Sequence, residues 1–209
     1  KTILITGGTD GIGLATAKLF AANDQNLLIH GRNAEKLKEV KAQLCSISDT
    51  IEVDSYLADL SSLSQIHSLA QKIIADHQKL DVLINNAGVF KVTPTRTADD
   101  LDIRFSVNTI APFILTQALA AILGETGRVI NLSSAAQAPV DIDGLKGLKV
   151  LADMEAYAQS KLAITMWSKS LADRYHNNGP TIIAVNPGSL LASKMVKDGF
   201  GVVGKDISI

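Results

Sequence analysis

The stretch that decides the fold is "TILITGGTDGIGLATAKLF", residues 2–20. Its first residues, 2–6, are mostly apolar and β-branched, which is typical of a buried strand. A turn with Gly7, Gly11 and Gly13 follows, and it leads directly into a helical pattern that we predict over 11–23. A strand joined to a helix by a glycine-rich turn is the first part of a βαβ unit.

The rest of the chain repeats this alternation of strand and helix. We predict further strands over 26–30, 51–56, 81–85, 128–133 and 181–186, and helices over 34–46, 62–77, 99–123 and 152–177. Most of these strands are apolar without alternation, as expected when both faces of a sheet are covered. The predicted fold class is therefore α/β, a doubly wound parallel sheet of Rossmann type with helices on both faces.

We expect a single domain over residues 1–209, because no linker, repeat or low-complexity segment interrupts the pattern. Two features are irregular. Residues 135–152 form a long connection between the fifth strand and the next helix, and no strand is recognisable after the sixth. A sheet of this kind can continue, so the pattern also fits a domain that lacks its C-terminal strand.

The composition excludes several classes of protein. Hydrophobic residues make up 46% of the 209 residues, which is enough for a substantial core. The formal net charge of −1 gives no support for nucleic acid or an anionic membrane as the main partner. No segment reaches the roughly 20 apolar residues of a membrane span, and the N-terminus does not read as a signal peptide. We therefore expect a soluble, cytoplasmic protein.

The cysteine and the histidines do not suggest a metal centre. Cys45, the single cysteine, can form neither an internal disulfide nor a cysteine cluster, and we expect it in the core beside Leu44. The four histidines show no ligand spacing, so no metal is predicted. His30 is expected at a strand end, and the other three are expected on the surface: His67, His77 and His176.

The glycine turn predicts a phosphate site. Without side chains at Gly7, Gly11 and Gly13, a pyrophosphate can approach the free N–H groups and the positive end of the dipole at the helix N-terminus. Thr9 and Ile12, in the same turn, are counted with them as cofactor-binding. The spacing is G-x-x-x-G-x-G, and the alternative is a tight strand-to-helix turn without a ligand.

The end of the second predicted strand indicates which dinucleotide binds. An acidic residue there would hold the adenosine 2′-hydroxyl of NAD, but this chain has Gly31 and Arg32. A guanidinium can bind a 2′-phosphate with two hydrogen bonds, which favours NADP, with NAD as the alternative. A solvated surface arginine is the other interpretation of Arg32. Asp10 counts against NADP, because it brings negative charge close to that phosphate.

Seven short motifs occur in order along nearly the whole chain: "TGGTDGIG" (6–13), "ADL" (58–60), "NNAG" (85–88), "VN" (107–108), "NLSS" (131–134), "YAQSK" (157–161) and "NPG" (186–188). With them the chain resembles the short-chain dehydrogenases/reductases of the single-domain type. The long loop after Ser134 is also similar to that of the retinol dehydrogenase and WW-domain oxidoreductase branch, a weaker resemblance.

This resemblance implies roles for residues at the matching positions. Asp59 and Leu60 would lie against the adenine. The cofactor cleft would be lined by Asn86, Ala87 and Gly88, and Pro187 and Gly188 would lie beside the nicotinamide. The family often has a threonine five residues after the proline, where this chain has Ala192; Ser189 and Ser193 are the candidates to replace it. The resemblance also implies a homo-oligomer.

Tyr157 and Lys161 stand four residues apart, which places both on one face of a helix. A carbonyl reduction needs a proton for the oxygen, and a phenol with a pKa of about 10 donates one but is a poor base. A nearby ammonium would lower that pKa, so that Tyr157 could act in both directions, and it could also hold ribose hydroxyls. An ordinary surface pair is the alternative interpretation.

Two further residues complete the expected catalytic set. Ser134, at the end of the fifth strand, is placed to bind the substrate oxygen. Asn108 matches the family position that supports a water path to Lys161. The expected function is an oxidoreductase that transfers a hydride between NADP(H) and an alcohol or carbonyl substrate, with Tyr157 as acid and base.

Two other functions stay open. One is an NAD(P)-binding sensor or scaffold without turnover, and the other is a different reaction on the same fold, such as epimerisation of a sugar nucleotide. The substrate itself is not identified. The apolar residues of the 135–152 loop suggest a hydrophobic one: Pro139, Val140, Leu145 and Leu148.

Overall fold

The computed structural model describes residues 1–176 and 178–188. Its strands are β1 (Thr2–Ile5), β2 (Asn26–Gly31), β3 (Val53–Leu57), β4 (Val82–Asn85), β5 (Arg128–Leu132) and β6 (Thr181–Val185). Its helices are α1 (Gly11–Ala21), α2 (Ala34–Cys45), α3 (Leu63–Asp76), α4 (Ile103–Phe105), α5 (Ala111–Leu123), α6 (Ile142–Leu145) and α7 (Asp153–Tyr175), with a π-helical turn, η1 (Ser106–Ile110), between α4 and α5.

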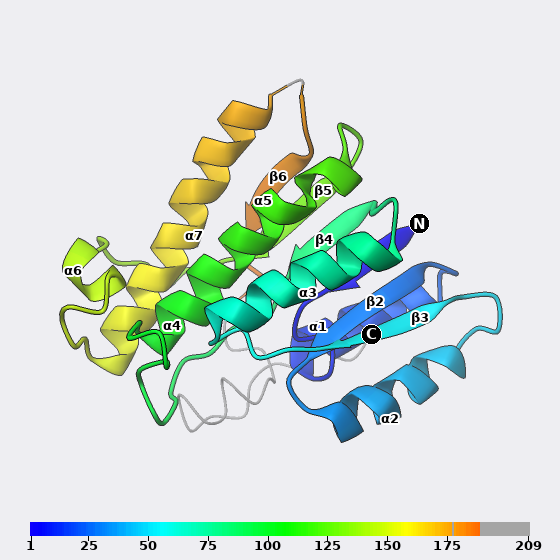
Figure 1. The fold of residues 1–209 in the computed structure, drawn as a ribbon, viewed down its shortest axis with the longest axis horizontal. Coiled ribbons are helices and arrows are strands. Elements are labelled where there is room, and N and C mark those ends of the chain that lie inside the picture. The colour runs from blue at the N-terminus through cyan, green and yellow to red at the C-terminus, as the bar shows by residue number, and fades with distance from the viewer. Residues whose placement is uncertain (177, 189–209) are drawn as a thin grey trace.

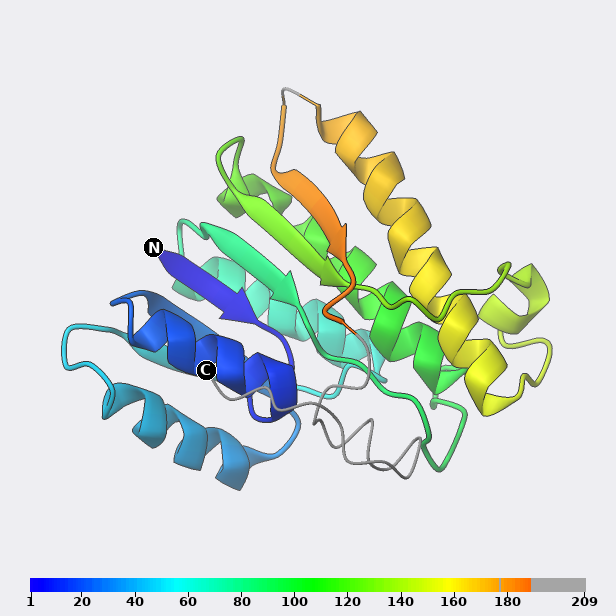
Figure 2. The same ribbon diagram turned by 180° about the vertical axis from the view of Figure 1, so that it is seen from behind.

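The described strands form one parallel sheet in the order β3-β2-β1-β4-β5-β6. Helices α3, α5 and α7 cover the face that Figure 1 turns to the viewer, and α1 and α2 cover the opposite face, seen in Figure 2. The predicted doubly wound α/β fold is therefore confirmed. Each predicted strand and helix is present, with ends that differ by a few residues at most except at the start of the helix predicted over 99–123.

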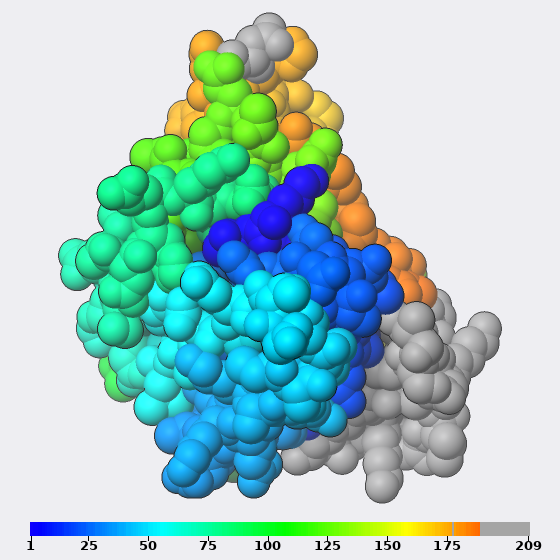
Figure 3. Space-filling view, turned by 90° about the vertical axis from the view of Figure 1, so that its right-hand side faces the viewer, coloured from blue at the N-terminus to red at the C-terminus, as the bar shows by residue number. Residues whose placement is uncertain are grey.

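The apolar strands fill two cores because successive side chains point to opposite faces. Ile3 and Ile5 of β1 belong to the core under α1 and α2, whereas Leu4 belongs to the core under α3 and α5. Helix α2 packs along the edge strand β3, on the side of the molecule that Figure 3 shows in blue and cyan. This two-sided burial explains why the strands carry no polar alternation.

The strand order places a crevice where β1 and β4 meet. From β1 the chain moves outward through β2 to β3, and then returns to the other side of β1 with β4. Ligands of open α/β sheets bind at the carboxyl ends of the strands at such a switch point. The glycine turn after β1 and the NNAG segment at the end of β4 both lie there.

The helix predicted over 99–123 starts later and has an inserted π-helical turn. Asp102 caps its start, because its carboxylate accepts the N–H of Arg104 at 2.8 Å. Pro112, in the first turn of α5, has no N–H, and its ring would clash with the carbonyl of Asn108 in an α-helix. The wider turn η1 relieves this conflict: the N–H of Ala111 bonds to Ser106, five residues back.

The helical run Ile103–Leu123 is long and apolar enough to cross a membrane by length and composition alone. It is buried over 56% of its most apolar window, and Leu115 and Leu119 lie in the core between the sheet and α3. A core helix passes the same test as a membrane span, and this burial identifies it as a core helix.

One expectation about a single residue was wrong, and one expected loop contains a short helix. Cys45 is exposed at the end of α2, because it lies about 100° around the helix from Leu44, which is buried. The connection 135–152 is partly ordered, since it contains α6, which the carboxylate of Asp141 caps by accepting the N–H groups of Asp143 and Gly144.

Candidate active site

The predicted site residues that the structure describes gather at the carboxyl edge of the sheet. The glycine turn follows β1, Arg32 follows β2, Asn86 follows β4 and Ser134 follows β5, while Tyr157 lies in the first half of α7. Residues from distant parts of the sequence thus share one edge, as the strand order requires. Ala192, Ser189 and Ser193 lie outside the described residues.

The glycine turn is closely packed. Gly7 and Gly11 have positive φ angles of 64° and 50°, which side chains other than glycine rarely adopt. A Cβ on Gly13 would lie 2.3 Å from the carbonyl oxygen of Gly7 and 2.4 Å from Nδ2 of Asn86. The backbone at the start of α1 is therefore uncovered by side chains from these positions, which fits the approach of a pyrophosphate.

Asn86 supports this turn from below. Its Nδ2 donates to the carbonyls of Thr6 and Gly7 at 2.9 and 3.0 Å, and the hydroxyl of Thr6 accepts the N–H groups of Asn86 and Ala87. Asn86, which was expected to line the cofactor cleft, therefore forms the hydrogen bonds of its side-chain amide within the protein. Thr6, which the motifs above did not single out, is 1% exposed and ties β1 to the NNAG segment.

His30 is a second support for the glycine turn. Its Nδ1 accepts the N–H of Gly7 at 3.3 Å, so Nε2 carries the proton and donates to the carbonyl of Ala58 at 3.0 Å. Burial lowers the pKa of His30 to about 4, against weaker opposing effects of Ala58 and Asp59. This histidine is a neutral bridge between the turn and the segment that precedes Asp59.

The side chains expected at the adenosine end of the cofactor differ in their exposure and in their hydrogen bonds. Arg32 is exposed, and no residue in the described ranges forms a hydrogen bond or ion pair with its guanidinium. Asp59 accepts the N–H of Ser61 at 2.9 Å, and its own N–H donates to Gln65. Leu60 is buried, at 4% exposure.

The charge of Asp10, which counted against NADP, is partly compensated. Its carboxylate accepts the N–H of Gly11 at 2.8 Å and lies 2.6 Å from the ammonium of Lys36 in α2. The side chain of Lys36 is half-exposed. The first turn of α2 therefore brings a second cation close to the negative group, on the side of Arg32.

Tyr157 is half-buried beside Ser134 and Phe90. Burial raises the pKa of the Tyr157 phenol, and the neighbouring side chain of Ser134 lowers it by less. The ring centroids of Tyr157 and Phe90 are 5.1 Å apart. The structure thus brings the predicted proton donor and the predicted oxygen-binding serine together.

Lys161 is deeply buried, at 4% exposure. Its Nζ donates to the carbonyl oxygen of Leu132 at 2.7 Å and lies 5.8 Å from the centroid of the Tyr157 ring. Burial lowers the pKa of Lys161 to about 8. We expected this ammonium to lower the pKa of Tyr157, and that expectation was wrong for this structure: burial dominates, and the pKa of Tyr157 is raised.

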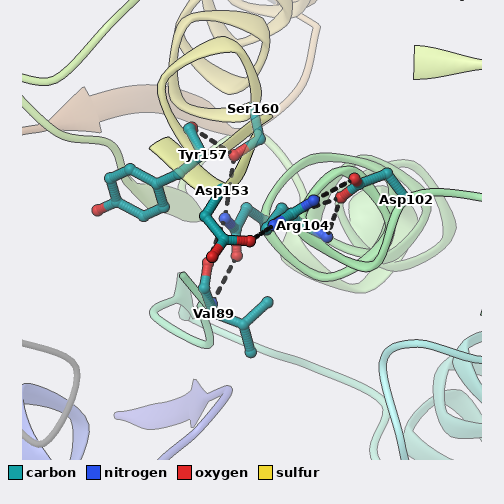
Figure 4. Close-up of polar contacts among 7 residues, drawn as sticks. Val89, Asp102, Arg104, Asp153, Tyr157 and Ser160 are labelled. Carbon is teal, nitrogen blue, oxygen red and sulfur yellow. Dashed lines mark hydrogen bonds and ion pairs between the residues drawn. The ribbon is translucent and has the colours of Figure 1, made fainter. Parts of the chain in front are cut away.

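Asn108 joins the loop after β4 to α7. Its Oδ1 accepts the N–H of Val89 at 2.8 Å, and its Nδ2 donates to the Val89 carbonyl at 2.9 Å and to Oγ of Ser160 at 3.0 Å. The hydroxyl of Ser160 donates in turn to the backbone oxygen of Tyr157 at 2.7 Å (Figure 4). The water path to Lys161 stays a prediction.

Sequence reasoning missed several polar residues under the site. Ser160, inside "YAQSK", and Ser133, next to Ser134, could have been found as buried polar positions of motifs already singled out. Ser133 donates to the backbone oxygen of Lys161 at 2.9 Å and contacts Thr165. Arg104, within "DIRFSVN", gave no signal, because a lone arginine in a helix usually lies on the surface.

The last described residues carry the NPG motif. Pro187 and Gly188 are exposed, and Gly188 has a φ of 110° and donates its N–H to Asn186 at 3.3 Å. No group of three or more His, Cys, Asp or Glu residues that could hold a metal ion occurs in the part of the chain that the structure describes.

Chemically, the arrangement combines a protonated phenol, a hydroxyl and a buried amine beside a helix N-terminus that is open to a phosphate. Such a set can hold an oxygen atom and give it a proton.

Comparisons with known proteins place this geometry in context. A family model described as short chain dehydrogenase matches residues 1–200. The chain is 35% identical over 193 residues to retinol dehydrogenase 13 of Homo sapiens. This match covers 90% of this chain and 58% of that protein. The chain is 34% identical over 198 residues to the polyprenol dehydrogenase of Homo sapiens, with coverages of 90% and 60%. The chain thus spans less than two thirds of these relatives.

A solved structure has the same fold. It is a short chain dehydrogenase from Burkholderia cenocepacia J2315 in complex with NADP, with a TM-score of 0.76 and 31% sequence identity. The match covers 93% of this chain and 76% of that one.

Proposed function

Since the chain belongs to the short-chain dehydrogenase family, we propose that it transfers a hydride between NADP(H) and an alcohol or carbonyl substrate. The dinucleotide, when bound, supplies or accepts the hydride at its nicotinamide ring. Tyr157 gives a proton to the substrate oxygen or takes one from it. Ser134 binds that oxygen, and Lys161 holds the ribose hydroxyls on the nicotinamide side of the cofactor.

The observation that carries the proposal is the contact between Ser134 and Tyr157, with the amine of Lys161 5.8 Å from the ring. Because the pKa of Tyr157 is raised, the phenol keeps its proton at neutral pH and is ready to act as an acid. This state favours reduction of a carbonyl. The reverse reaction needs a phenolate, which this raised pKa disfavours.

Two cations support NADP as the cofactor. The exposed guanidinium of Arg32 is available for a 2′-phosphate, and Lys36 offsets the carboxylate of Asp10. A related structure of 31% identity is described as a complex with NADP. In this proposal the glycine turn holds the pyrophosphate, with Asp59 and Leu60 beside the adenine and Pro187 and Gly188 beside the nicotinamide.

A hydrophobic alcohol or the matching carbonyl is the proposed substrate. Two relatives are named for retinol and polyprenol, both of which are apolar alcohols. The segment from α6 to the start of α7 exposes large apolar side chains that such a substrate could contact, at Ile142, Leu148, Val150 and Met154. A cytoplasmic location and a homo-oligomeric state also belong to the proposal.

The substitution Tyr157→Phe tests the mechanism. It removes the transferable proton and keeps the ring that packs on Phe90, so the turnover number should fall by about 10² to 10⁴-fold. The dissociation constant of NADPH, followed by its fluorescence, should stay within twofold. Tyr175→Phe, at the other end of α7, is the matched control and should keep full activity.

Unchanged turnover in Tyr157→Phe would refute the role of the phenol. A second experiment uses the unmodified protein and tests whether it has any turnover. NADPH binding without oxidation of the cofactor, across a panel of aldehydes and ketones that includes retinal, would instead support a sensor or scaffold.

A further inference from the structure

A buried arginine connects the segment before Asn108 to the helix of Tyr157. Arg104 is fully buried, and its guanidinium binds the carboxylate of Asp102 through Nε at 2.8 Å and Nη2 at 2.5 Å. Its remaining arm, Nη1, donates to the carboxylate of Asp153. Asp102 alone already compensates the charge of Arg104, so Asp153 adds a link between two helices rather than a missing countercharge.

Asp153 is the first residue of α7, and the structure gives this helix no side-chain cap. Ala152, at the N-cap position, cannot accept the free N–H groups through its side chain. The contact of Asp153 with Arg104 therefore fixes the start of α7 through a residue that does not belong to this helix. Tyr157 lies four residues after Asp153, on the same face and one turn further along.

A second link holds α7 just after Tyr157. The hydroxyl of Ser160 accepts from Asn108 and donates to the backbone oxygen of Tyr157, while Thr109 donates to the backbone oxygen of Ser160 at 2.8 Å. Both links come from one short segment, residues 104–109, which spans the end of α4 and the turn η1. Figure 4 shows the contacts of Arg104 with Asp102 and Asp153 and the contact of Ser160 with Tyr157, with the ring of Tyr157 pointing away from them.

We propose that Arg104 is a positioning residue for Tyr157, and that it acts by fixing the first turn of α7 through Asp153. Without the Asp153 link, the hydrogen bonds that tie this part of α7 to its surroundings lie after Tyr157, at Ser160 and Lys161, so the turn that carries the phenol can pivot about them. With both links, its position relative to Ser134 is fixed. Small displacements at a reacting group matter, because an error of about 1 Å can cost about 100-fold in rate. This inference rests on the proposed function of Tyr157.

The substitution Asp153→Asn separates positioning from folding. It keeps the shape of the side chain and replaces the charge-assisted hydrogen bond from Arg104 with a weaker neutral one. The buried pair of Arg104 and Asp102 stays intact, so no buried charge loses its partner. Asp153 is itself 44% exposed, and the variant should fold. We expect the turnover number to fall by about tenfold, while the dissociation constant of NADPH stays within twofold.

Two further variants sharpen the test. Asp153→Glu keeps the charge and should recover most of the turnover. Asp173→Asn removes a carboxylate from an exposed ion pair with Lys169 on the same helix, distant from Tyr157, and should leave turnover unchanged. An unchanged turnover number in Asp153→Asn, with or without a lower melting temperature, would overturn the proposal.

A second readout does not depend on turnover. Tyrosine labelled with ¹³C in the ring gives a resonance for Tyr157 that the Tyr157→Phe variant identifies by its loss. Asp153→Asn should shift or broaden this resonance, whereas Asp173→Asn should not. If the unmodified protein turned over no substrate, the proposed function would fail, yet this spectrum would still decide the positioning role: an unshifted resonance would refute it.

Discussion

The side chain of Asn108 pairs with the backbone of Val89 as a neighbouring strand would. It accepts the N–H at 2.8 Å and donates to the carbonyl at 2.9 Å. The pair fixes the loop that follows the NNAG segment, and a third hydrogen bond from the same amide reaches Ser160 in α7. One buried amide therefore holds together the loop beside the cofactor cleft and the helix of Tyr157.

Asn108→Ala should lower stability and turnover together. Three hydrogen bonds are lost and the partly buried backbone groups of Val89 stay unsatisfied, so the free energy of unfolding should fall by about 2 kcal/mol or more. Urea denaturation measures this change. Asn23→Ala removes an exposed hydrogen bond to Leu19 and should change stability by only about 0.5 kcal/mol. Equal effects of the two variants would contradict this account of Asn108.

His30 should make the protein sensitive to mild acid. Its pKa is about 4 in the folded protein, below the ordinary histidine value of 6.5, so the unfolded state takes up the proton first as pH falls. This contribution is fully present above about pH 6.5 and is lost as pH falls toward 4. It amounts to about 3 kcal/mol at most.

The variant His30→Gln isolates this effect. The difference between the unfolding free energies of the unmodified protein and the variant should shrink steadily from pH 7 to pH 4. Gln71→Ala, at an exposed position on α3 without an ionisable side chain, should give a constant difference over the same range. A constant difference for His30→Gln as well would show that its protonation does not oppose folding.

Lys161→Met should increase stability while abolishing turnover. The ammonium of Lys161 is buried, and burial lowers its pKa to about 8, so at pH 7 the folded protein carries a charge removed from water. Methionine fills similar space without that cost, and we expect the free energy of unfolding to rise by about 1 to 3 kcal/mol. Thermal denaturation and NADPH oxidation measure the two effects.

The control for Lys161→Met is Lys169→Met on the exposed face of α7, where stability should change by about 0.5 kcal/mol or less. A loss of stability in Lys161→Met would mean that the hydrogen bond to Leu132 outweighs the cost of burial.

Arg32→Ala should weaken NADPH selectively. A charge-assisted hydrogen bond contributes about 1.5 to 3 kcal/mol, so the dissociation constant of NADPH should rise by about 10 to 100-fold. NADH lacks the 2′-phosphate, and its dissociation constant should stay within twofold. Lys38→Ala, also exposed on α2, should affect neither cofactor. Equal losses for both cofactors would place Arg32 away from the phosphate.

The sequence predicts the fold well because its signals are local. An apolar run such as 26–30 or a turn with Gly7 and Gly13 specifies its own conformation, and the right-handed crossover rule orders the strands. The gathering of Ser134 and Tyr157 follows from that order.

The supporting contacts depend on three-dimensional neighbours that no spacing reveals. Arg104 meets Asp153 across 49 residues of sequence, and Lys161 meets Leu132 across 29. The π-helical turn could have been suspected from Pro112, but not its location. The prediction for Cys45 was wrong because adjacent residues of a helix point in different directions, so that one can lie in the core and the next on the surface.

The turn η1 also sets the rotational phase between two parts of one helix. Each residue of an α-helix advances it by about 100°. Deleting one residue between Arg104 and Leu115 would turn Arg104 away from α7 if Leu115 kept its place in the core. The number of residues in this interval is then as much a determinant of the site as their identity, and a relative with a shorter interval would have to anchor its tyrosine by other means.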